Sequence, residues 1–274
     1  MEKVGMVGVG AMGSALLERL KRAGVEATVY DSYPPALQAA RALGATFAGC
    51  PADVARAATI VDVVVRTDQD VLDCMTGKGG ILEGGENHIL VLLHSTILPQ
   101  TTRHVAALAG QRHVEVIDAC MVGVPEVARA GNLSFLVGGP RELFEKARPH
   151  LLRMGKQAFH MGPLGSGNAA KLIKNMVTGA ETLIIHEAMQ IGQAAGIPYP
   201  QALEMMRQVY SGTILDRWQN VFDPSGARPT PRAGRNIFDK DIPLAGELAR
   251  QCGLELPITQ QLVAAAHRIV KGKS

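Results

Sequence analysis

A glycine-rich loop near the start of the chain has the spacing of a phosphate-binding turn. It follows the apolar run Val4 to Val9 and opens a helical pattern. The first glycine allows a tight turn, the second lets a pyrophosphate approach the backbone, and the third lets the helix pack closely. The helix N-terminus attracts phosphate. We therefore expect a dinucleotide to contact six residues: Gly8, Val9, Gly10, Ala11, Met12 and Gly13.

A carboxylate stands where a dinucleotide site identifies its cofactor. Asp31 ends the second apolar run, eighteen residues after Gly13. A carboxylate there accepts hydrogen bonds from the adenosine ribose hydroxyls and repels a 2′-phosphate. The neighbouring Ser32 and Tyr33 offer no guanidinium to receive such a phosphate. The sequence favours NAD over NADP, with Ser32 as a further cofactor contact.

The first half of the chain alternates short apolar runs with helical patterns, which is typical of a doubly wound parallel sheet. The proline-initiated segments Pro35 to Leu43 and Pro99 to Ala109 have the spacing of crossover helices. The predicted strands are Val4 to Val9, Ala27 to Tyr30, Ile60 to Val65, His88 to Leu93, Val114 to Asp118 and Leu133 to Val137.

The pattern changes after the turn-rich segment that ends near residue 167. An unbroken helical stretch, Asn168 to Ala195, is followed by shorter helical segments. These are Pro200 to Val209, Ile242 to Cys252 and Pro257 to Val270. We predict an α/β Rossmann domain over residues 1–162 and an all-α domain over 163–274, entered through a long interdomain helix.

Besides the glycine loop, four further segments resemble motifs of the β-hydroxyacid dehydrogenases, the family of 3-hydroxyisobutyrate dehydrogenase and tartronate semialdehyde reductase. The segments follow one another in the order of the family's motifs. The resemblance covers nearly the whole chain. The segments are His94 to Pro99, Asp118 to Val124 with Ala130 to Leu133, Gly167 to Asn175, and Phe238 to Asp241. It implies hydride transfer between NAD and a β-hydroxy acid or its semialdehyde.

The resemblance also implies roles for single residues. Lys171 exchanges a proton with the substrate oxygen, and Asn175, at i+4 on the same helix face, holds the substrate. Thr96 lies beside the nicotinamide ribose, Lys240 folds back onto the cofactor, and Asp241 supports the substrate wall. Without the resemblance, Lys171 would be interpreted as part of a solvated helix face.

The predicted substrate loop departs from the family pattern. The usual Ser-Gly-Gly stretch is replaced by Val122, Gly123 and Val124, so a hydroxyl is missing and the wall becomes more apolar. We expect Met121, Val122 and Gly123 to bind a substrate that is bulkier or more apolar than the family's small acids. Two other departures are Lys174, in place of an asparagine, and the segment Arg66 to Asp68, whose Thr67 we expect near the adenosine.

Composition excludes several other classes. The net charge is +3, and the basic residues are scattered except for Arg228, Arg232 and Arg235, which could close on a substrate carboxylate. We therefore expect no nucleic acid partner. The four cysteines and eight histidines show no metal-ligand spacing, and no apolar stretch is long enough for a membrane helix. The sequence predicts a cytoplasmic protein without metal, in which His94 alone among the histidines could touch a ligand.

Two alternatives remain beside the hydroxyacid dehydrogenase. An imine or ketone reductase on the same scaffold would suit the valines, although the family's imine reductases usually lack a lysine at the Lys171 position. A non-catalytic nucleotide-binding module would typically have lost Lys171. The long helix is apolar on both faces from Leu172 to Ile191, so we expect a homodimer or homotetramer formed through the helical domain.

Overall fold

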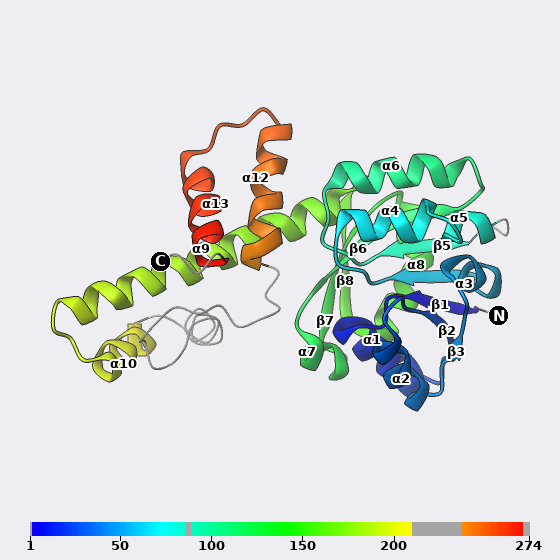
Figure 1. Cartoon of the computed structure of the whole chain (residues 1–274), viewed down its shortest axis with the longest axis horizontal. Helices are drawn as coiled ribbons and strands as arrows, with labels where there is room; N and C mark the ends of the chain where they lie inside the picture. Colours follow the sequence, from blue (N-terminus) through cyan, green and yellow to red (C-terminus); the bar gives the residue numbers. More distant parts are fainter. Residues whose placement is uncertain (1, 86–88, 210–236, 271–274) are drawn as a thin grey trace. The chain divides into compact units, whose positions relative to one another are not determined.

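The computed structural model describes residues 2–85, 89–209 and 237–270. The chain divides into two compact units, Met1–Lys171 and Leu172–Ser274. Helix α9, Ser166–Ala194, begins in the first unit and continues into the second (Figure 1). The domain boundary after residue 162 stays a prediction. Gly162 ends the last strand of the first unit, and α9 begins four residues later.

The first unit is built on an eight-stranded sheet in the order β3-β2-β1-β4-β5-β6-β7-β8. Counted from the β3 edge, its first six strands have the order 3-2-1-4-5-6 of a Rossmann fold. Every strand pair is parallel except β6 and β7, which run antiparallel. The strands are β1 Val4–Val7, β2 Ala27–Tyr30, β3 Thr46–Phe47, β4 Ile60–Val63, β5 Leu90–Leu93, β6 Glu115–Val122, β7 Leu133–Gly138 and β8 Gly155–Gly162.

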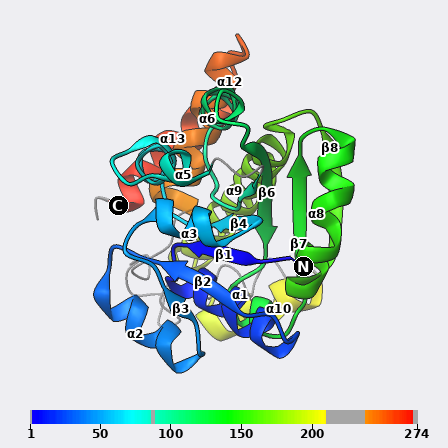
Figure 2. The same ribbon diagram turned by 90° about the vertical axis from the view of Figure 1, so that its right-hand side faces the viewer.

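Helices cover both faces of this sheet, and each face has its own core (Figure 2). Along β5, Leu90 and Leu92 point into one core while Val91 and Leu93 point into the other, because successive side chains of a strand alternate. One face packs on α1 Ala11–Arg22, α2 Pro34–Ala42, α7 Pro125–Arg129 and α8 Arg141–Met154. The other packs on α3 Pro51–Ala57, α4 Asp68–Thr76, α5 Ile81–Gly84 and α6 Pro99–Gly110.

The sequence pattern did not predict strands β3 and β8. The first has only two residues, and the second is an edge strand whose residues are exposed or half-buried after Gly155. Neither produces the apolar run that marks a buried parallel strand. The antiparallel course of β7 was also not predicted, since an apolar run carries no information about strand direction.

The second unit is helical, as predicted. Besides the main part of α9 it contains four described helices, namely α10 Tyr199–Val209, the π-helix η1 Ile237–Asp241, α12 Ile242–Gln251 and α13 Pro257–Val270. Their core gathers Leu183, Ile185, Met189, Ala202, Phe238, Ile242, Leu262 and Ala266. Residues Arg228, Arg232 and Arg235 lie outside the described residues.

A charged network lies inside the first unit. The side chain of Asp62, on β4, is fully buried between two histidines, and its oxygens lie 2.8 Å from His94 Nε2 and 2.8 Å from His150 Nε2. His94 Nδ1 lies 2.7 Å from the carbonyl oxygen of Ala119. With both ring nitrogens occupied and its side chain in the core, His94 serves the fold. The prediction that it could touch a ligand is wrong.

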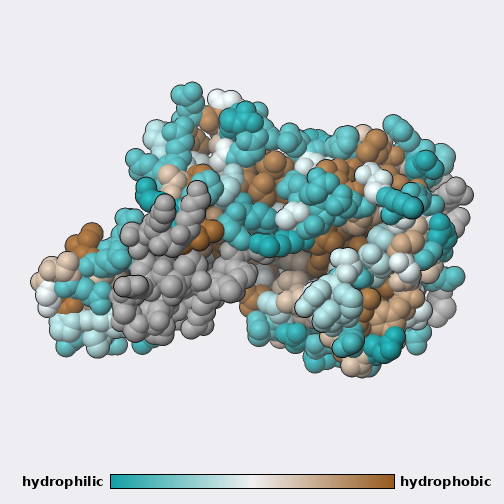
Figure 3. Space-filling model, viewed as in Figure 1, coloured by the Kyte–Doolittle hydropathy of each residue, from teal (hydrophilic) through white to brown (hydrophobic). Residues whose placement is uncertain are grey.

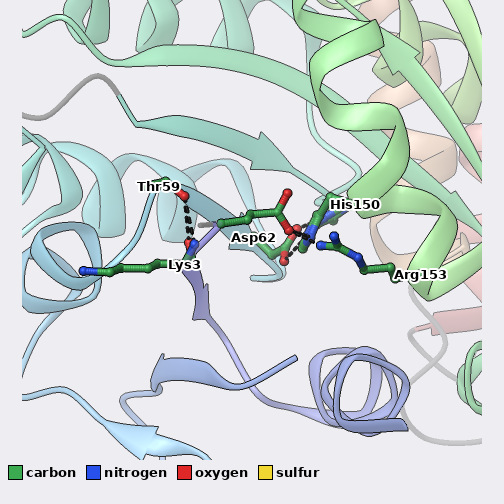
Figure 4. Close-up of polar contacts among 7 residues, drawn as sticks. Lys3, Thr59, Asp62, His150 and Arg153 are labelled. Atoms are coloured by element: carbon green, nitrogen blue, oxygen red, sulfur yellow. Dashed lines mark hydrogen bonds and ion pairs between the residues drawn. The ribbon is translucent and has the colours of Figure 1, made fainter. Parts of the chain in front are cut away.

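The network continues to the surface at the start of the chain. Glu2 Oε1 lies 3.4 Å from His150 Nδ1 and also pairs with Arg153 of α8. Figure 4 shows Asp62, His150 and Arg153 together, beside a separate hydrogen bond from the Lys3 amide to Thr59. Burial acts to raise the pKa of Asp62, but the two histidines hold it well below its usual range. Burial acts to lower the pKa of His150, but Asp62 and Glu2 raise it to about 9.

Candidate active site

The glycine loop forms a tight turn between β1 and α1. Gly8 has a φ of +92°, and a Cβ built on it would lie 2.4 Å from the carbonyl oxygen of Val64. A Cβ on Gly13 would lie 2.1 Å from the Gly8 carbonyl oxygen, so only glycine lets α1 pack this closely. A Cβ on Gly10, the N-cap of α1, would meet nothing within 4 Å. The loop thus has both a close helix packing and an open approach to the helix N-terminus, which is what a pyrophosphate requires.

Asp31 fixes this loop to the end of β2. Its Oδ2 accepts a hydrogen bond from the Val9 amide at 2.8 Å, and its Oδ1 accepts one from the Tyr33 amide at 2.8 Å. Ser14 Oγ donates to the Val9 carbonyl oxygen at 2.6 Å. Each carboxylate oxygen has two lone pairs, so these bonds leave acceptor capacity for ribose hydroxyls.

A cavity of about 520 Å³ opens beside the loop. Its lining includes four of the predicted cofactor contacts: Gly8, Gly10, Asp31 and Ser32. The lining also contains Arg66, from the segment predicted near the adenosine, and three charged residues that were not predicted there, namely Asp70, Asp73 and Lys78. They come from the segment between β4 and α5, which passes alongside the loop because β4 neighbours β1 in the sheet.

Thr67 has a defined structural role at the start of α4. Its hydroxyl accepts a hydrogen bond from the Asp70 amide at 3.1 Å, and Asp70 Oδ2 accepts one from the Thr67 amide at 2.8 Å. This reciprocal capping box satisfies two N–H groups of the helix end. The Thr-x-x-Asp spacing is visible in the sequence and could have been recognised there. A cofactor contact by Thr67 stays a prediction.

The predicted substrate loop follows β6. Gly123 has a φ of +144°, and a Cβ there would come within 2.5 Å of Leu133 Cδ2, so the position requires glycine. Met121 and Val122 are half-buried at the end of the strand. Val124 caps α7 and is 54% exposed. An exposed, β-branched residue therefore stands in place of the flexible glycine of the family motif.

The start of α9 is held by the sheet of the first unit. Asp118, on β6, accepts hydrogen bonds from the Gly165 and Asn168 amides, both at 2.7 Å. Burial raises the pKa of Asp118 to about 6, although these amides oppose the rise. Lys171 follows Asn168 by three residues and is half-buried. Lys171 therefore lies one helical turn after the hydrogen-bonded start of the helix.

Three predicted residues of the helical unit lie together. Asn175 is buried, and its Nδ2 donates to Asp241 Oδ2 at 2.7 Å. The other oxygen of Asp241 pairs with Lys240 Nζ at 3.1 Å. The neighbouring Lys174 places its Nζ 3.3 Å from Asn175 Oδ1. Residues 66 positions apart in the sequence thus fix the orientation of the Asn175 amide.

Within the described part of the chain there is no cluster of three His, Cys, Asp or Glu side chains able to hold a metal ion. None of the helices in the described ranges is long and apolar enough to cross a membrane.

The fold and the cleft together define a protein with a dinucleotide-binding Rossmann unit followed by a helical unit. The family model for the NAD binding domain of 6-phosphogluconate dehydrogenase matches residues 3–162. The model for the NAD-binding domain of NADP-dependent 3-hydroxyisobutyrate dehydrogenase matches residues 165–273. The chain belongs to the β-hydroxyacid dehydrogenase family, which includes 3-hydroxyisobutyrate dehydrogenase.

Similar proteins extend over nearly the whole chain. The NAD-dependent L-serine dehydrogenase of Pseudomonas aeruginosa is 31% identical over 94% of this chain and 89% of its own. The 3-hydroxyisobutyrate dehydrogenase of the same organism is 32% identical over 89% of this chain and 84% of its own. The solved structure of Mycobacterium tuberculosis 3-hydroxyisobutyrate dehydrogenase with L-serine has a TM-score of 0.85 at 25% identity, covering 99% of this chain and 94% of that one. The chain is a dehydrogenase of a family that acts on CH–OH donors with NAD or NADP.

Proposed function

We propose that this protein transfers a hydride between NAD(H) and a β-hydroxy acid, or the matching semialdehyde, with Lys171 as the general acid and base. The observation that carries the proposal is the arrangement on α9. Lys171 and Asn175 are four residues apart on one helix face, and a buried carboxylate, Asp241, orients the Asn175 amide. A helix face that only contacts solvent would not require Asn175 to be buried and held in one orientation.

The chemistry assigns a separate task to each residue. When bound, the nicotinamide accepts or returns the hydride at the substrate carbon. In the oxidation direction the neutral amine of Lys171 accepts the proton of the substrate hydroxyl, and in reduction its ammonium returns a proton to the carbonyl oxygen. Asn175, held by Asp241, binds the substrate, and backbone amides at Gly123 receive its carboxylate. Lys240 and Thr96 contact the cofactor.

The exposed Val124 and the half-buried Val122 support a substrate larger or more apolar than 3-hydroxyisobutyrate. A panel of β-hydroxy acids with small polar, alkyl and aryl substituents tests this through NADH formation. We expect the highest kcat/KM on an alkyl- or aryl-substituted acid. Activity confined to L-serine, 3-hydroxyisobutyrate and, in the reduction direction, tartronate semialdehyde would contradict the role given to the valines. A separate assay follows NADH oxidation in the presence of cyclic imines. Activity in that assay, with none on any hydroxy acid of the panel, would overturn the proposed function in favour of an imine reductase.

For the cofactor we expect kcat/KM with NAD to exceed that with NADP at least tenfold, equivalent to about 1.4 kcal/mol. The Asp31 carboxylate is fixed in the cleft by two backbone amides, where it would repel a 2′-phosphate. Asp31→Asn should narrow this preference. Asp73→Asn, which alters another carboxylate lining the same cleft, is the matched control and should retain it. Equal use of both cofactors by the parent enzyme would refute the assignment to NAD.

We also propose a homodimer formed through the helical unit. Along α9, four exposed aliphatic side chains are spaced by four, seven and seven residues and so form one stripe: Ile173, Val177, Ile184 and Ile191. Each is at least 50% exposed. Figure 3 shows part of the apolar surface of this unit where α9 leads into α10. A contiguous apolar stripe of this length is typical of a protein interface.

A further inference from the structure

The attachment of α9 to the sheet depends on a charged residue inside the core. Asp118 lies in the middle of β6 with a fully buried side chain. Its Oδ1 accepts a hydrogen bond from the Gly165 amide at 2.7 Å, and its Oδ2 accepts one from the Asn168 amide at 2.7 Å. These partners follow it by 47 and 50 residues. Asp118 thus caps α9 from another element, where a negative charge also suits the helix dipole.

Two glycines make this close approach possible. A Cβ on Gly167 would lie 2.3 Å from the Leu136 carbonyl oxygen and 2.7 Å from Asp118 Oδ2. A Cβ on Gly138, in β7, would lie 2.6 Å from Asp118 Oδ1 and 2.7 Å from the Ser166 amide nitrogen. The first turn of α9 therefore rests directly on the strands, without side chains in between.

Asn168 connects the same turn to the loop after β5. It is fully buried, and its Nδ2 donates to the Ser95 carbonyl oxygen at 3.0 Å. Its Oδ1 accepts a hydrogen bond from Thr102 Oγ1 at 2.7 Å. Ser95 is the neighbour of Thr96, the residue proposed beside the nicotinamide ribose. One side chain thus ties the turn that precedes Lys171 to the loop that carries Thr96.

We propose that Asp118 and Asn168 are positioning residues that set the place of Lys171 relative to the loop carrying Thr96. The proposal rests on the proposed function, because it assumes that Lys171 exchanges a proton with the substrate. Lys171 follows Asn168 by three residues, so a shift of the first turn moves its ammonium group directly. A displacement of about 1 Å in an active site can reduce the rate of reaction about 100-fold.

The energetics of Asp118 also favour a positioning role. Burial disfavours the charged form of a carboxylate, and the hydrogen bonds from the two backbone amides offset part of that cost. The raised pKa of Asp118 reflects this cost. The carboxylate that bears this cost holds the Gly165 and Asn168 amides in one place.

Three variants test the proposal. Asp118→Asn keeps the shape of the side chain but turns an NH2 group toward backbone amides, so it releases at least one of them. Asn168→Ala keeps the Asp118 cap and removes the tie to Ser95. His150→Gln, on α8, disturbs a buried ion pair of the same unit, formed by His150 with Asp62 of β4. It is the control for loss of stability.

We expect Asp118→Asn to lower kcat about 10- to 100-fold and Asn168→Ala about 3- to 30-fold, by the misplacement argument. The Kd for NADH should stay within about threefold of the parent value in both variants, because neither residue lines the cofactor cleft. When assayed well below its melting temperature, His150→Gln should have the same kcat as the parent enzyme. Hydrogen exchange of residues 166–175 should be faster in Asp118→Asn and Asn168→Ala and unchanged in His150→Gln.

The parent value of kcat in both Asp118→Asn and Asn168→Ala would overturn the proposal. A loss of kcat in all three variants that simply follows the decrease in melting temperature would also overturn it. If Asp118→Asn does not fold, Asn168→Ala decides alone. The exchange measurement needs no substrate. Faster exchange at α9 supports the attachment of this helix by Asp118 and Asn168, even if Lys171→Ala retains activity and so refutes the proposed function. Unchanged exchange overturns the attachment, whatever reaction the protein catalyses.

Discussion

Replacing Lys171 by alanine is expected to lower kcat about 10²- to 10⁴-fold, the range for a positioned general acid or base. The lost interaction matters mainly in the transition state, so the affinity for NADH should remain close to that of the parent enzyme. Steady-state kinetics on the best substrate of the panel measure the first quantity. Titration of NADH followed by fluorescence measures the second.

Two further variants define the origin of this loss. Lys171→Arg should not restore activity, because a guanidinium stays charged above pH 12 and cannot readily give up a proton. Lys146→Ala removes an exposed lysine of α8 that pairs with Glu115, and it should retain full activity. If Lys171→Ala or Lys171→Arg keeps more than about a tenth of kcat while binding NADH normally, Lys171 is not the acid and base, and its side chain belongs to a solvated helix face.

The second large effect is a loss of stability as the pH rises. The pKa of His150 is raised from 6.5 to about 9 by Asp62 and Glu2, against the effect of burial. A raised pKa in the folded state stabilises the fold fully below pH 6.5, and this contribution is lost as the pH rises through about 9. The expected loss is about 3 kcal/mol. For a chain of this size it corresponds to a fall of about 6 to 12 °C in melting temperature between pH 6.5 and 9.

The variant His150→Gln should remove most of this pH dependence, because glutamine does not titrate. His160→Gln is the matched control, since the His160 ring bonds a backbone carbonyl oxygen, that of Gly139, and not a carboxylate. The titration of Asp118 does not overlap this pH range. Its pKa is raised from 3.8 to about 6, so its effect on the free energy of unfolding changes between about pH 4 and 6. A melting temperature of the parent enzyme that stays constant from pH 6.5 to 9 would show that His150 is not protonated in the fold.

The local parts of the fold and site could be predicted from the sequence. The glycine loop can be recognised within six residues, because each glycine meets a steric requirement of one turn or one helix end. The spacing of Lys171 and Asn175 is likewise a property of a single helix, and four residues always fall on one face. The alternation of apolar runs with helical patterns predicted the Rossmann sheet and the long helix α9 for the same reason.

The direction and length of strands depended on the tertiary structure. Strand β8 is exposed at a sheet edge and lacks an apolar run, so only its pairing with β7 defines it. The antiparallel pairing of β6 with β7 is equally absent from the local pattern. Hydrogen bonds between strands are formed by backbone groups, which every residue carries, so composition does not specify which strands pair.

The polar contacts within the core were decided by tertiary structure alone. Asp62 and Asp118 each have apolar neighbours on both sides within a strand, and this pattern indicates a buried partner. The identity of the partners was not visible, because His150 follows Asp62 by 88 residues and Asn168 follows Asp118 by 50. The prediction that His94 could touch a ligand was wrong for this reason. The position of His94 at a strand end suggested a ligand contact. In the structure, both His94 and His150 of α8 bond the Asp62 carboxylate, and His94 lies in the core. Periodic patterns report which face of an element is buried, and only the packed chain decides which buried polar groups meet.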